Sequence, residues 1–386
     1  MFIYIAIFIY LLAITYQYDI HKGNRRYAKV NYVISCILLI VVAGVRYRIG
    51  YDTTNYMETY LHAPSFSELL RGYKFVGDPL WMYIIAISKE IYEEFFIVQF
   101  FQAIIVNTAV FWFVRRHSPK QFLAILLYYL LLWWNLCFEA MREAIAVAFF
   151  LIALDAVLSG KGLLRYYLRV WPAIFAHSFG FVTLLFPFIK YLKLNKYTIV
   201  VYLLVIVALF SVKNYINDII SLLEMTSDMA LDKATKYFDS NVYGESNLNL
   251  SGILSHIIGG ILPCISVILL LRNKPNKESR DLIPFVFVYL CVVILRIQIP
   301  IFFRFLNYFE ILVIVAFTHA IYLERVKIKR QLVSLVMSGM VFLRFYSLNS
   351  YDVGTPIKAY HRYVPYNSIF QKNYNKESEI IFRAVD

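Results

Sequence analysis

The sequence has few charged residues and few cysteines, and both shortages narrow the class of protein it belongs to. Only 16% of its 386 residues are charged, whereas about a quarter are charged in soluble domains. All four cysteines fall within apolar runs, so we interpret them as small hydrophobic residues, without a disulfide framework or a metal-ligand spacing. These shortages exclude an ordinary soluble enzyme and a small disulfide-rich secreted protein.

Motifs that bind nucleotides or metals are missing as well. The chain has no Walker loop, no glycine-rich nucleotide fingerprint, no Asp-x-Asp pair and no His-x-x-x-His. We therefore expect no metal and no cofactor, and the energy for any reaction has to lie in an activated substrate such as a pyrophosphate-linked sugar. The N-terminus is apolar from Phe2 without a basic leader, which indicates a retained first span and not a cleaved signal.

Apolar sequence of helical type is what the chain has in abundance. Hydrophobic residues make up 60% of it, and the mean hydropathy is +0.62. Repeated long apolar runs predict an all-α, polytopic membrane protein, and the short alternating segments of a membrane barrel are absent. The net charge of +13 comes mostly from loops that are cytoplasmic by their Lys and Arg content, so no nucleic-acid partner is expected.

The apolar runs and the loop charges together predict about ten transmembrane helices with both termini outside. The predicted spans are residues 2–16, 30–45, 95–114, 121–137, 144–158, 197–212, 251–271, 282–299, 304–323 and 332–348. Residues 80–92 form a half-span, interpreted as an interfacial or re-entrant helix. A single transmembrane domain thus covers residues 1–348, with outer loops at 46–94 and 213–250, and an extracytoplasmic tail follows at 349–386.

The segment 170–189 allows two topologies. A single crossing would place Lys190, Lys193 and Lys196 outside and would invert every later loop. A re-entrant hairpin, broken near Pro172 and His177-Ser178, keeps both ends inside. We favour the hairpin, since non-helical backbone at membrane depth is tolerated where it lines a cavity or is buried in protein.

On this topology the unusual ionisable residues gather in the outer third of the membrane. They are Arg46, Arg48, Asp52, Glu139, Arg142, Glu143, Arg296, Arg304 and Glu310, with His177 if the hairpin reaches that level. The planar guanidinium of Arg suits phosphate oxygens. Several of them in one outward cavity suit a lipid-linked phosphate or pyrophosphate, and neighbouring Tyr and Trp rings are candidates for stacking on sugars.

Simpler interpretations of these residues stay open. Arg46 and Arg48 are also compatible with interfacial anchors whose charged ends reach the water. Arg142 has the i, i+3 spacing to pair with Glu139 across a short turn, and a lone intramembrane His177 is more often a packing group.

Three further charged positions have their own expectations. Arg296, inside a span, calls for a function or a buried partner. Glu310 is a candidate partner of Arg304, although it is too far along the helix for a direct pair. Asp155 is expected to face the cytoplasm at the inner end of its span.

Several short motifs occur in a set order along the chain. They are Arg46-x-x-x-Gly50-x-Asp52-x-x-x-Tyr56, Asp78-Pro79, Met141-Arg142-Glu143-Ala144-Ile145-Ala146, Ala176-His177-Ser178, Phe303-Arg304 with Tyr308-Phe309, and Pro365-Tyr366-Asn367-Ser368. In this order the chain resembles the EpsG family of bacterial exopolysaccharide proteins, relatives of the Wzy-type O-antigen polymerases. One departure is Ala176, where a bulky residue often precedes the histidine.

This resemblance implies a GT-C-like membrane glycosyltransferase of the bacterial inner membrane. Such a protein joins oligosaccharide repeat units carried on undecaprenyl pyrophosphate, at the face toward the periplasm or cell exterior. A chain-length-regulating membrane protein is a candidate partner. The substrate-binding candidates are then Arg46, Arg48, Tyr56, Arg142, Arg296, Arg304 and Tyr366, and the candidate catalytic bases are Asp52, His177 and Glu143.

Two other functions compete with the polymerase. A ligase of the O-antigen type would move finished polymer from the same lipid to another acceptor, and its loss would leave unattached polymer where loss of a polymerase leaves single repeat units. A transporter or flippase of lipid-linked sugars would need polar groups through the inner half of the membrane, and the spans below the outer cluster are apolar. The sequence therefore favours the polymerase.

Overall fold

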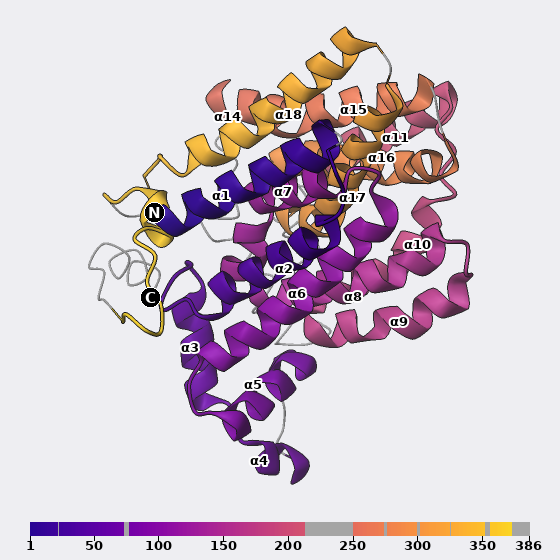
Figure 1. Ribbon diagram of the computed structural model, residues 1–386. Coiled ribbons are helices and arrows are strands. Elements are labelled where there is room, and N and C mark those ends of the chain that lie inside the picture. Colours follow the sequence, from indigo (N-terminus) through magenta and orange to yellow (C-terminus); the bar gives the residue numbers. More distant parts are fainter. Residues whose placement is uncertain are drawn as a thin grey trace. The chain divides into compact units, whose positions relative to one another are not determined.

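The computed structural model of the protein describes residues 1–21, 23–72, 77–212, 250–273, 276–298, 302–324, 326–351 and 356–372. Throughout these ranges the regular structure is helical (Figure 1). The β-type pairing that occurs within them is confined to isolated bridges, such as Arg46 with Ser368. The all-α fold class expected from the apolar periodicity is confirmed.

The helices follow the apolar runs of the sequence closely. The first half of the chain forms α1 (Phe2–Thr15), η1 (Tyr16–Ile20), α2 (Ala28–Gly44), α3 (Thr53–His62), α4 (Phe66–Leu70), α5 (Pro79–Ile91), α6 (Phe96–His117), α7 (Gln121–Leu131), η2 (Asn135–Glu139), α8 (Met141–Leu158), α9 (Leu163–Ala176), η3 (Ser178–Leu185) and α10 (Phe186–Ile189). The second half forms α11 (Lys196–Val212), α14 (Leu250–His256), η5 (Ile257–Ile261), α15 (Leu262–Asn273), α16 (Lys277–Gln298), α17 (Phe303–Leu323), α18 (Lys327–Ser347) and η7 (Ala359–Arg362).

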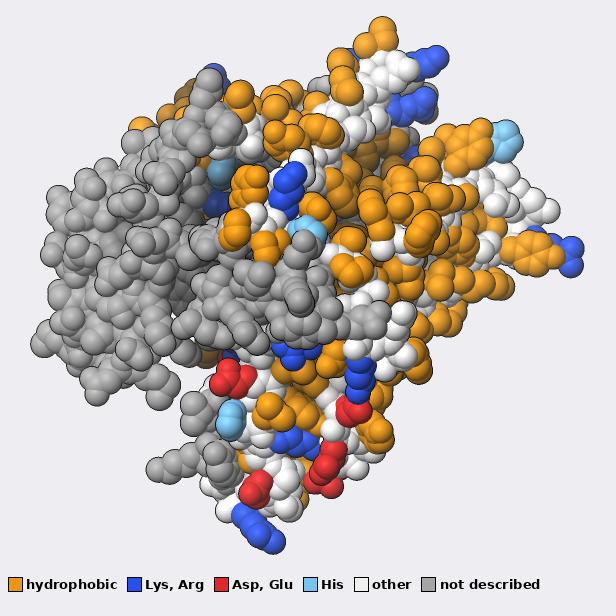
Figure 2. Space-filling view, turned by 90° about the vertical axis from the view of Figure 1, so that its left-hand side faces the viewer, with side chains coloured by type: hydrophobic (Ala, Val, Ile, Leu, Met, Phe, Trp, Pro, Cys, Tyr) orange, Lys and Arg blue, Asp and Glu red, His pale blue; other side chains and the backbone are white. Residues whose placement is uncertain are grey.

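Several of these helices suit a membrane by their length and composition. Within the described ranges, four are long and apolar enough to cross one, namely Phe2–Ile20, Phe96–His117, Gly252–Asn273 and Phe303–Leu323. On the face shown in Figure 2, hydrophobic side chains cover much of the described surface, and acidic ones gather near α3, α4 and α5. A surface this apolar is typical of contact with lipid. The count of about ten spans, with N-out and C-out ends, stays a prediction, and most of the outer loop 213–250 lies outside the described residues.

The chain forms two compact units. Unit 1 comprises residues 1–187 and 345–386, and unit 2 comprises residues 188–344. In unit 1, α6 packs against α2 and α8, α8 packs against α9, and α1 packs against α7. In unit 2, α16 packs against α17, α15 and α11. Each unit has its own apolar core, and that of unit 2 includes most of α17.

Residues 163–189 fold as two antiparallel helical segments, α9 and η3 with α10. The hydroxyl of Tyr166 donates a hydrogen bond to the carbonyl of Thr183, which ties the two segments together. The chain reverses at His177, where the backbone is extended (φ −159°, ψ 140°). The predicted break near Pro172 is wrong, because α9 continues through this proline, whose ring removes only one helical hydrogen bond. Re-entry of this hairpin into a membrane stays a prediction.

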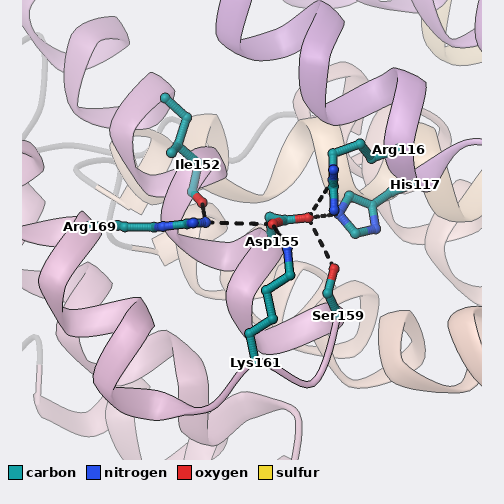
Figure 3. A network of polar contacts seen from close by, with 7 residues as sticks. All are labelled: Arg116, His117, Ile152, Asp155, Ser159, Lys161 and Arg169. Carbon is teal, nitrogen blue, oxygen red and sulfur yellow. Dashed lines mark hydrogen bonds and ion pairs between the residues drawn. The ribbon is translucent and has the colours of Figure 1, made fainter.

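Asp155 lies near the C-terminal end of α8 and is completely buried. Its carboxylate accepts hydrogen bonds from Arg116 Nε at 2.7 Å and from Lys161 Nζ at 3.0 Å. Arg169 Nη1 lies 3.6 Å from it, and His117 Nε2 lies 3.2 Å from it (Figure 3). The expectation that Asp155 simply faces the cytoplasm is therefore wrong. Asp155 thus joins α8 to α6, to α9 and to the turn after α8, because each of these three elements contributes a cation that pairs with its carboxylate.

Candidate functional site

The polar stretch after α2, residues 46–56, is folded around the guanidinium of Arg46. This side chain is only 1% exposed. Its Nη1 donates to the carbonyl of Ala43 and its Nε to that of Ile49, while Nη2 lies 3.3 Å from Met141 Sδ. The guanidinium also covers the ring of Phe138, 4.8 Å from the centroid. Burial lowers the pKa of Arg46 to about 10, so the group stays charged at neutral pH and ties the stretch to the start of α8.

Backbone geometry in the same stretch depends on glycine. Gly50 has φ +104°, and a Cβ atom there would lie 2.3 Å from the carbonyl oxygen of Phe138. Only glycine meets both conditions without strain. Arg48 has φ +50°, an uncommon conformation for a residue with a side chain. The two positive φ angles fold the stretch back onto η2.

Glu139 fixes the other side of the stretch. Its Oε2 accepts hydrogen bonds from the backbone N–H groups of Tyr51, at 2.7 Å, and Asp52, at 3.3 Å. Its Oε1 accepts from the hydroxyl of Tyr363 at 2.5 Å. The alternative in which Glu139 pairs with Arg142 does not hold within the described residues, where Arg142 forms its salt bridge with Asp78.

The C-terminal tail covers the end of α2. The backbone N–H of Tyr47 donates to Asn367 O at 3.0 Å, and that of Ile369 donates to Val45 O at 2.9 Å. Tyr366, a predicted substrate ligand, donates its hydroxyl to Val42 O at 2.9 Å. The motif at 365–368 therefore shapes the stretch 46–56 through contacts between residues more than 300 positions apart.

Arg142, in the first turn of α8, joins three helix starts. Its Nη1 lies 3.0 Å from Asp78 Oδ2, the residue that precedes α5. Its guanidinium covers the ring of Tyr56 in α3, 5.7 Å from the centroid. Asp52, the residue before α3, is within electrostatic range of both Arg142 and Tyr56. Burial raises the pKa of Tyr56 to about 12, which keeps its phenol protonated.

This meeting of helix starts favours an anion. Helix N-termini carry partial positive charge and unsatisfied N–H groups, and Arg142 adds a full charge to those of α3, α5 and α8. The Arg142 side chain is 39% exposed, and its Nε has no hydrogen-bond partner among the described residues. The carboxylates of Asp78 and Asp52 offset the charge of Arg142, so the attraction for an anion rests on the helix N-termini and on the exposed part of the guanidinium. The group of Asp52, Tyr56, Asp78 and Arg142 is named the Arg142 cluster below.

His177 belongs to the same end of α8 as Arg142. Arg169 of α9 lies beside α8, with Nη1 3.5 Å from Ile152 O and 3.6 Å from Asp155 Oδ2. From there α9 runs toward His177 while α8 runs back toward Glu143, with the same rise per residue. His177 therefore lies level with the first turn of α8, at the end opposite Asp155.

The two remaining base candidates differ from Asp52 in exposure. Glu143 is 2% exposed and His177 is 6% exposed, whereas Asp52 is partly exposed. His177 Nδ1 accepts a hydrogen bond from the backbone N–H of Phe179 at 3.2 Å. A neutral ring bonded in this way carries its proton on Nε2. His177 is thus arranged to donate a hydrogen bond.

Arg296 and Arg304 belong to unit 2. Glu310, which is only partly buried, lies within electrostatic range of Arg344 and Arg296. A buried partner of Arg296 stays a prediction. The guanidinium of Arg304 covers the ring of Phe303, 5.4 Å from the centroid. Their roles as substrate ligands stay predictions.

The two tryptophans that follow α7 have a packing role. Trp133 is fully buried and Trp134 is 8% exposed. The ring centroid of Trp134 lies 4.5 Å from that of Tyr4 and 5.2 Å from that of Tyr363. The expectation that these rings stack on sugars does not suit their burial, because they fill the space between α1, η2 and the tail.

The sequence did not indicate the partners of two residues of the site, Asp78 and Glu139. Asp78 is recognisable in the sequence only as part of an Asp-Pro helix start, and its pairing with Arg142 crosses 64 residues. Glu139 is recognisable as a member of the ionisable cluster, but its acceptance of hydrogen bonds from Tyr51 and Tyr363 is not. Only the folded arrangement shows which cation or donor each carboxylate meets.

The chain was compared with protein families, curated proteins and solved structures, and a family profile matches most of it. No curated protein and no solved structure matches the chain significantly. The profile of the EpsG family matches residues 29–368, which includes the stretch 46–56, the Arg142 cluster, His177 and the tail motif. The chain, a helical protein with several apolar helices of membrane-spanning length, belongs to the EpsG family.

Proposed function

We propose that the protein is a membrane polysaccharide polymerase of GT-C-like architecture. It joins oligosaccharide repeat units carried on undecaprenyl pyrophosphate at the outer face of the bacterial inner membrane, without a metal. Membership of the EpsG family supports a polysaccharide polymerase and a lipid-linked oligosaccharide substrate. The apolar helices support a multi-pass membrane location.

The observation that carries the proposal is the Arg142 cluster. A pyrophosphate leaving group gains negative charge as the glycosidic bond breaks, and fixed donors aimed at that charge lower the barrier. Arg142, partly exposed above three helix N-termini, supplies such donors. Arg48 is a second candidate ligand, whereas the contacts of Arg46 support a structural role.

The reaction transfers the growing chain to the next repeat unit. Asp52 takes the proton from the acceptor hydroxyl, the oxygen attacks C1 of the sugar at the reducing end of the donor chain, and the bond from C1 to the pyrophosphate oxygen breaks. The lipid pyrophosphate leaves with the electron pair, stabilised by Arg142. Asp52 suits the role of base better than His177, whose Nδ1 lone pair is occupied and whose Nε2 carries a proton. His177 is then a donor to substrate oxygen.

A complementation experiment tests this function. Cells that carry Arg142→Ala are expected to lose the polymer ladder and to accumulate single lipid-linked repeat units, with the protein inserted in normal amount. The matched control is Arg71→Ala, an exposed arginine just after α4, which is expected to keep the ladder. A normal ladder from Arg142→Ala would refute the role of Arg142. Accumulation of unattached polymer on deletion of the protein would indicate a ligase.

A further inference from the structure

A cavity of about 240 Å³ lies in unit 1, between α3, the start of α6 and the tail. Met57, Tyr60 and Leu61 of α3 form one wall, Phe96 and Gln99 of α6 form another, and Lys372 belongs to the tail side. The Arg142 cluster touches α3 through Tyr56, a residue that does not line the cavity. The cavity is therefore separate from that cluster, although α3 contributes to both.

Two buried polar groups in the cavity wall lack partners. Gln99 is 2% exposed and Tyr60 is 7% exposed. Within the described ranges, neither Gln99 Nε2 nor the Tyr60 hydroxyl has a hydrogen-bond partner. A buried polar atom without a partner costs about 1–3 kcal/mol. A polar ligand that bonds to both atoms removes this cost.

The charges around the cavity favour a neutral ligand over a phosphate. Arg48 and Lys372 line it together with Glu93 and Glu94, and Lys372 Nζ lies 3.2 Å from Glu94 Oε2. The guanidinium of Arg46 is committed to protein groups. The lining holds three cations against two carboxylates, an excess of one positive charge that gives only a weak net attraction for a phosphate. Carboxylates beside an amide and a phenol suit hydroxyl groups, which both donate and accept.

The apolar part of the wall and the size of the cavity point to a single ring. Phe95 and Phe96 bring aromatic surface beside the carboxylates of Glu93 and Glu94. Alternating hydroxyl and C–H faces are the chemistry of a pyranose. The volume lies below the about 300–1,000 Å³ of pockets for drug-sized ligands, so the space suits one sugar ring and not a whole repeat unit.

We propose that this cavity is a saccharide subsite that holds one neutral pyranose ring of the polymer substrate, with Gln99 and Tyr60 as its buried hydrogen-bonding residues. The assignment rests on the proposed polymerase function for the identity of the sugar as substrate. It adds to that function a binding site that is separate from Arg142, the main proposed pyrophosphate ligand, and that shares Arg48 with the proposed ligands.

Binding of free sugars to the full-length protein in lipid nanodiscs tests the subsite. Saturation-transfer NMR with glucose, galactose and N-acetylglucosamine is expected to show binding of at least one sugar. Gln99→Leu and Tyr60→Phe preserve volume and remove one hydrogen bond each, so each is expected to weaken that binding about five-fold. The matched control is Gln102→Leu in the same helix, because Gln102 is fully buried, donates to Leu136 O and does not line the cavity.

The outcomes separate this subsite from the proposed reaction. Arg142→Ala is expected to keep sugar binding while it loses the polymer ladder. The subsite is refuted if no sugar binds to the wild-type protein, or if Gln99→Leu and Tyr60→Phe bind as well as Gln102→Leu. Binding of inorganic pyrophosphate that is lost in Gln99→Leu would overturn the saccharide assignment in favour of an anion site.

Discussion

The carboxylate of Glu139 accepts a hydrogen bond from the hydroxyl of Tyr363 at 2.5 Å, across 224 residues of chain. The same carboxylate accepts from the backbone N–H groups of Tyr51 and Asp52. One side chain just before α8 thus holds both the stretch 46–56 and the C-terminal tail. It sets the position of Asp52, the proposed base.

Glu139→Ala is therefore expected to reduce both stability and activity. It leaves two backbone donors and one phenol without their acceptor, which costs on the order of 2 kcal/mol. We expect a lower unfolding temperature in detergent and a polymer yield reduced more than ten-fold. The control is Glu58→Ala, an exposed carboxylate of α3. Equal unfolding temperatures for the two variants would contradict the bridging role of Glu139.

Gly50→Ala is expected to destabilise the protein more than the same replacement at another glycine that has a positive φ. The methyl group would have to lie 2.3 Å from Phe138 O, in addition to the unfavourable φ of +104°. Gly72 has φ +87° and open space around the position of a Cβ, so Gly72→Ala reports the cost of φ alone, about 1 kcal/mol. Thermal unfolding of both variants measures the difference, and similar losses would show that the close approach to Phe138 is relaxed.

Asp52→Asn tests the assignment of the base. Loss of a positioned general base typically costs 10²–10⁴-fold in rate, so we expect polymerisation to fall at least about 100-fold. His177→Gln keeps a hydrogen-bond donor, so we expect its polymerisation rate to fall less than about ten-fold. Initial rates on a purified lipid-linked repeat unit compare the two variants. A greater loss in His177→Gln than in Asp52→Asn would reverse the assignment.

Asp155→Asn is expected to destabilise the protein without a direct effect on the reaction. The cationic groups around Asp155 would lose their shared counter-charge, and breaking a buried pair costs about 3–5 kcal/mol. Because Arg116, Lys161 and Arg169 are 31–41% exposed, solvent screening lowers our expectation to about 2 kcal/mol. Lys161→Gln removes only one of these cations. We expect its loss of stability, measured by thermal unfolding, to be less than half that of Asp155→Asn.

Much of the secondary structure was predictable because apolar runs of helical length leave few alternatives. The half-span expected at 80–92 became α5, with Pro79 at its first position, and the span expected at 197–212 became α11. Errors arose where local signals compete. Pro172 suggested a break, yet α9 continues to the reversal at His177. The close approach of Gly180 to Ala173 O at this reversal depends on the fold, so the sequence alone did not indicate it.

The candidate site was predictable only as a set of residue types in order. Arginine, carboxylate, glycine and tyrosine in the stretch 46–56, together with Arg142 and His177, predicted a site for a lipid-linked phosphate. The order of the motifs resembled the EpsG family, and only this resemblance implied a polymerase. Partners were not predictable, because a carboxylate can pair with any donor that the fold brings near it. Arg142 has the sequence spacing to pair with Glu139 but pairs with Asp78.

The sequence by itself therefore determined that this is a helical, largely apolar protein of the EpsG family, because helix periodicity and motif order are properties of neighbouring residues. Only the tertiary structure decided that Arg46 is a buried residue bonded to protein groups, while Arg142 is partly exposed where three helices begin. The reason is physical: burial and pairing depend on residues that are distant in the chain, such as Tyr363 and Tyr366, which pack against the stretch 46–56 and the end of α2.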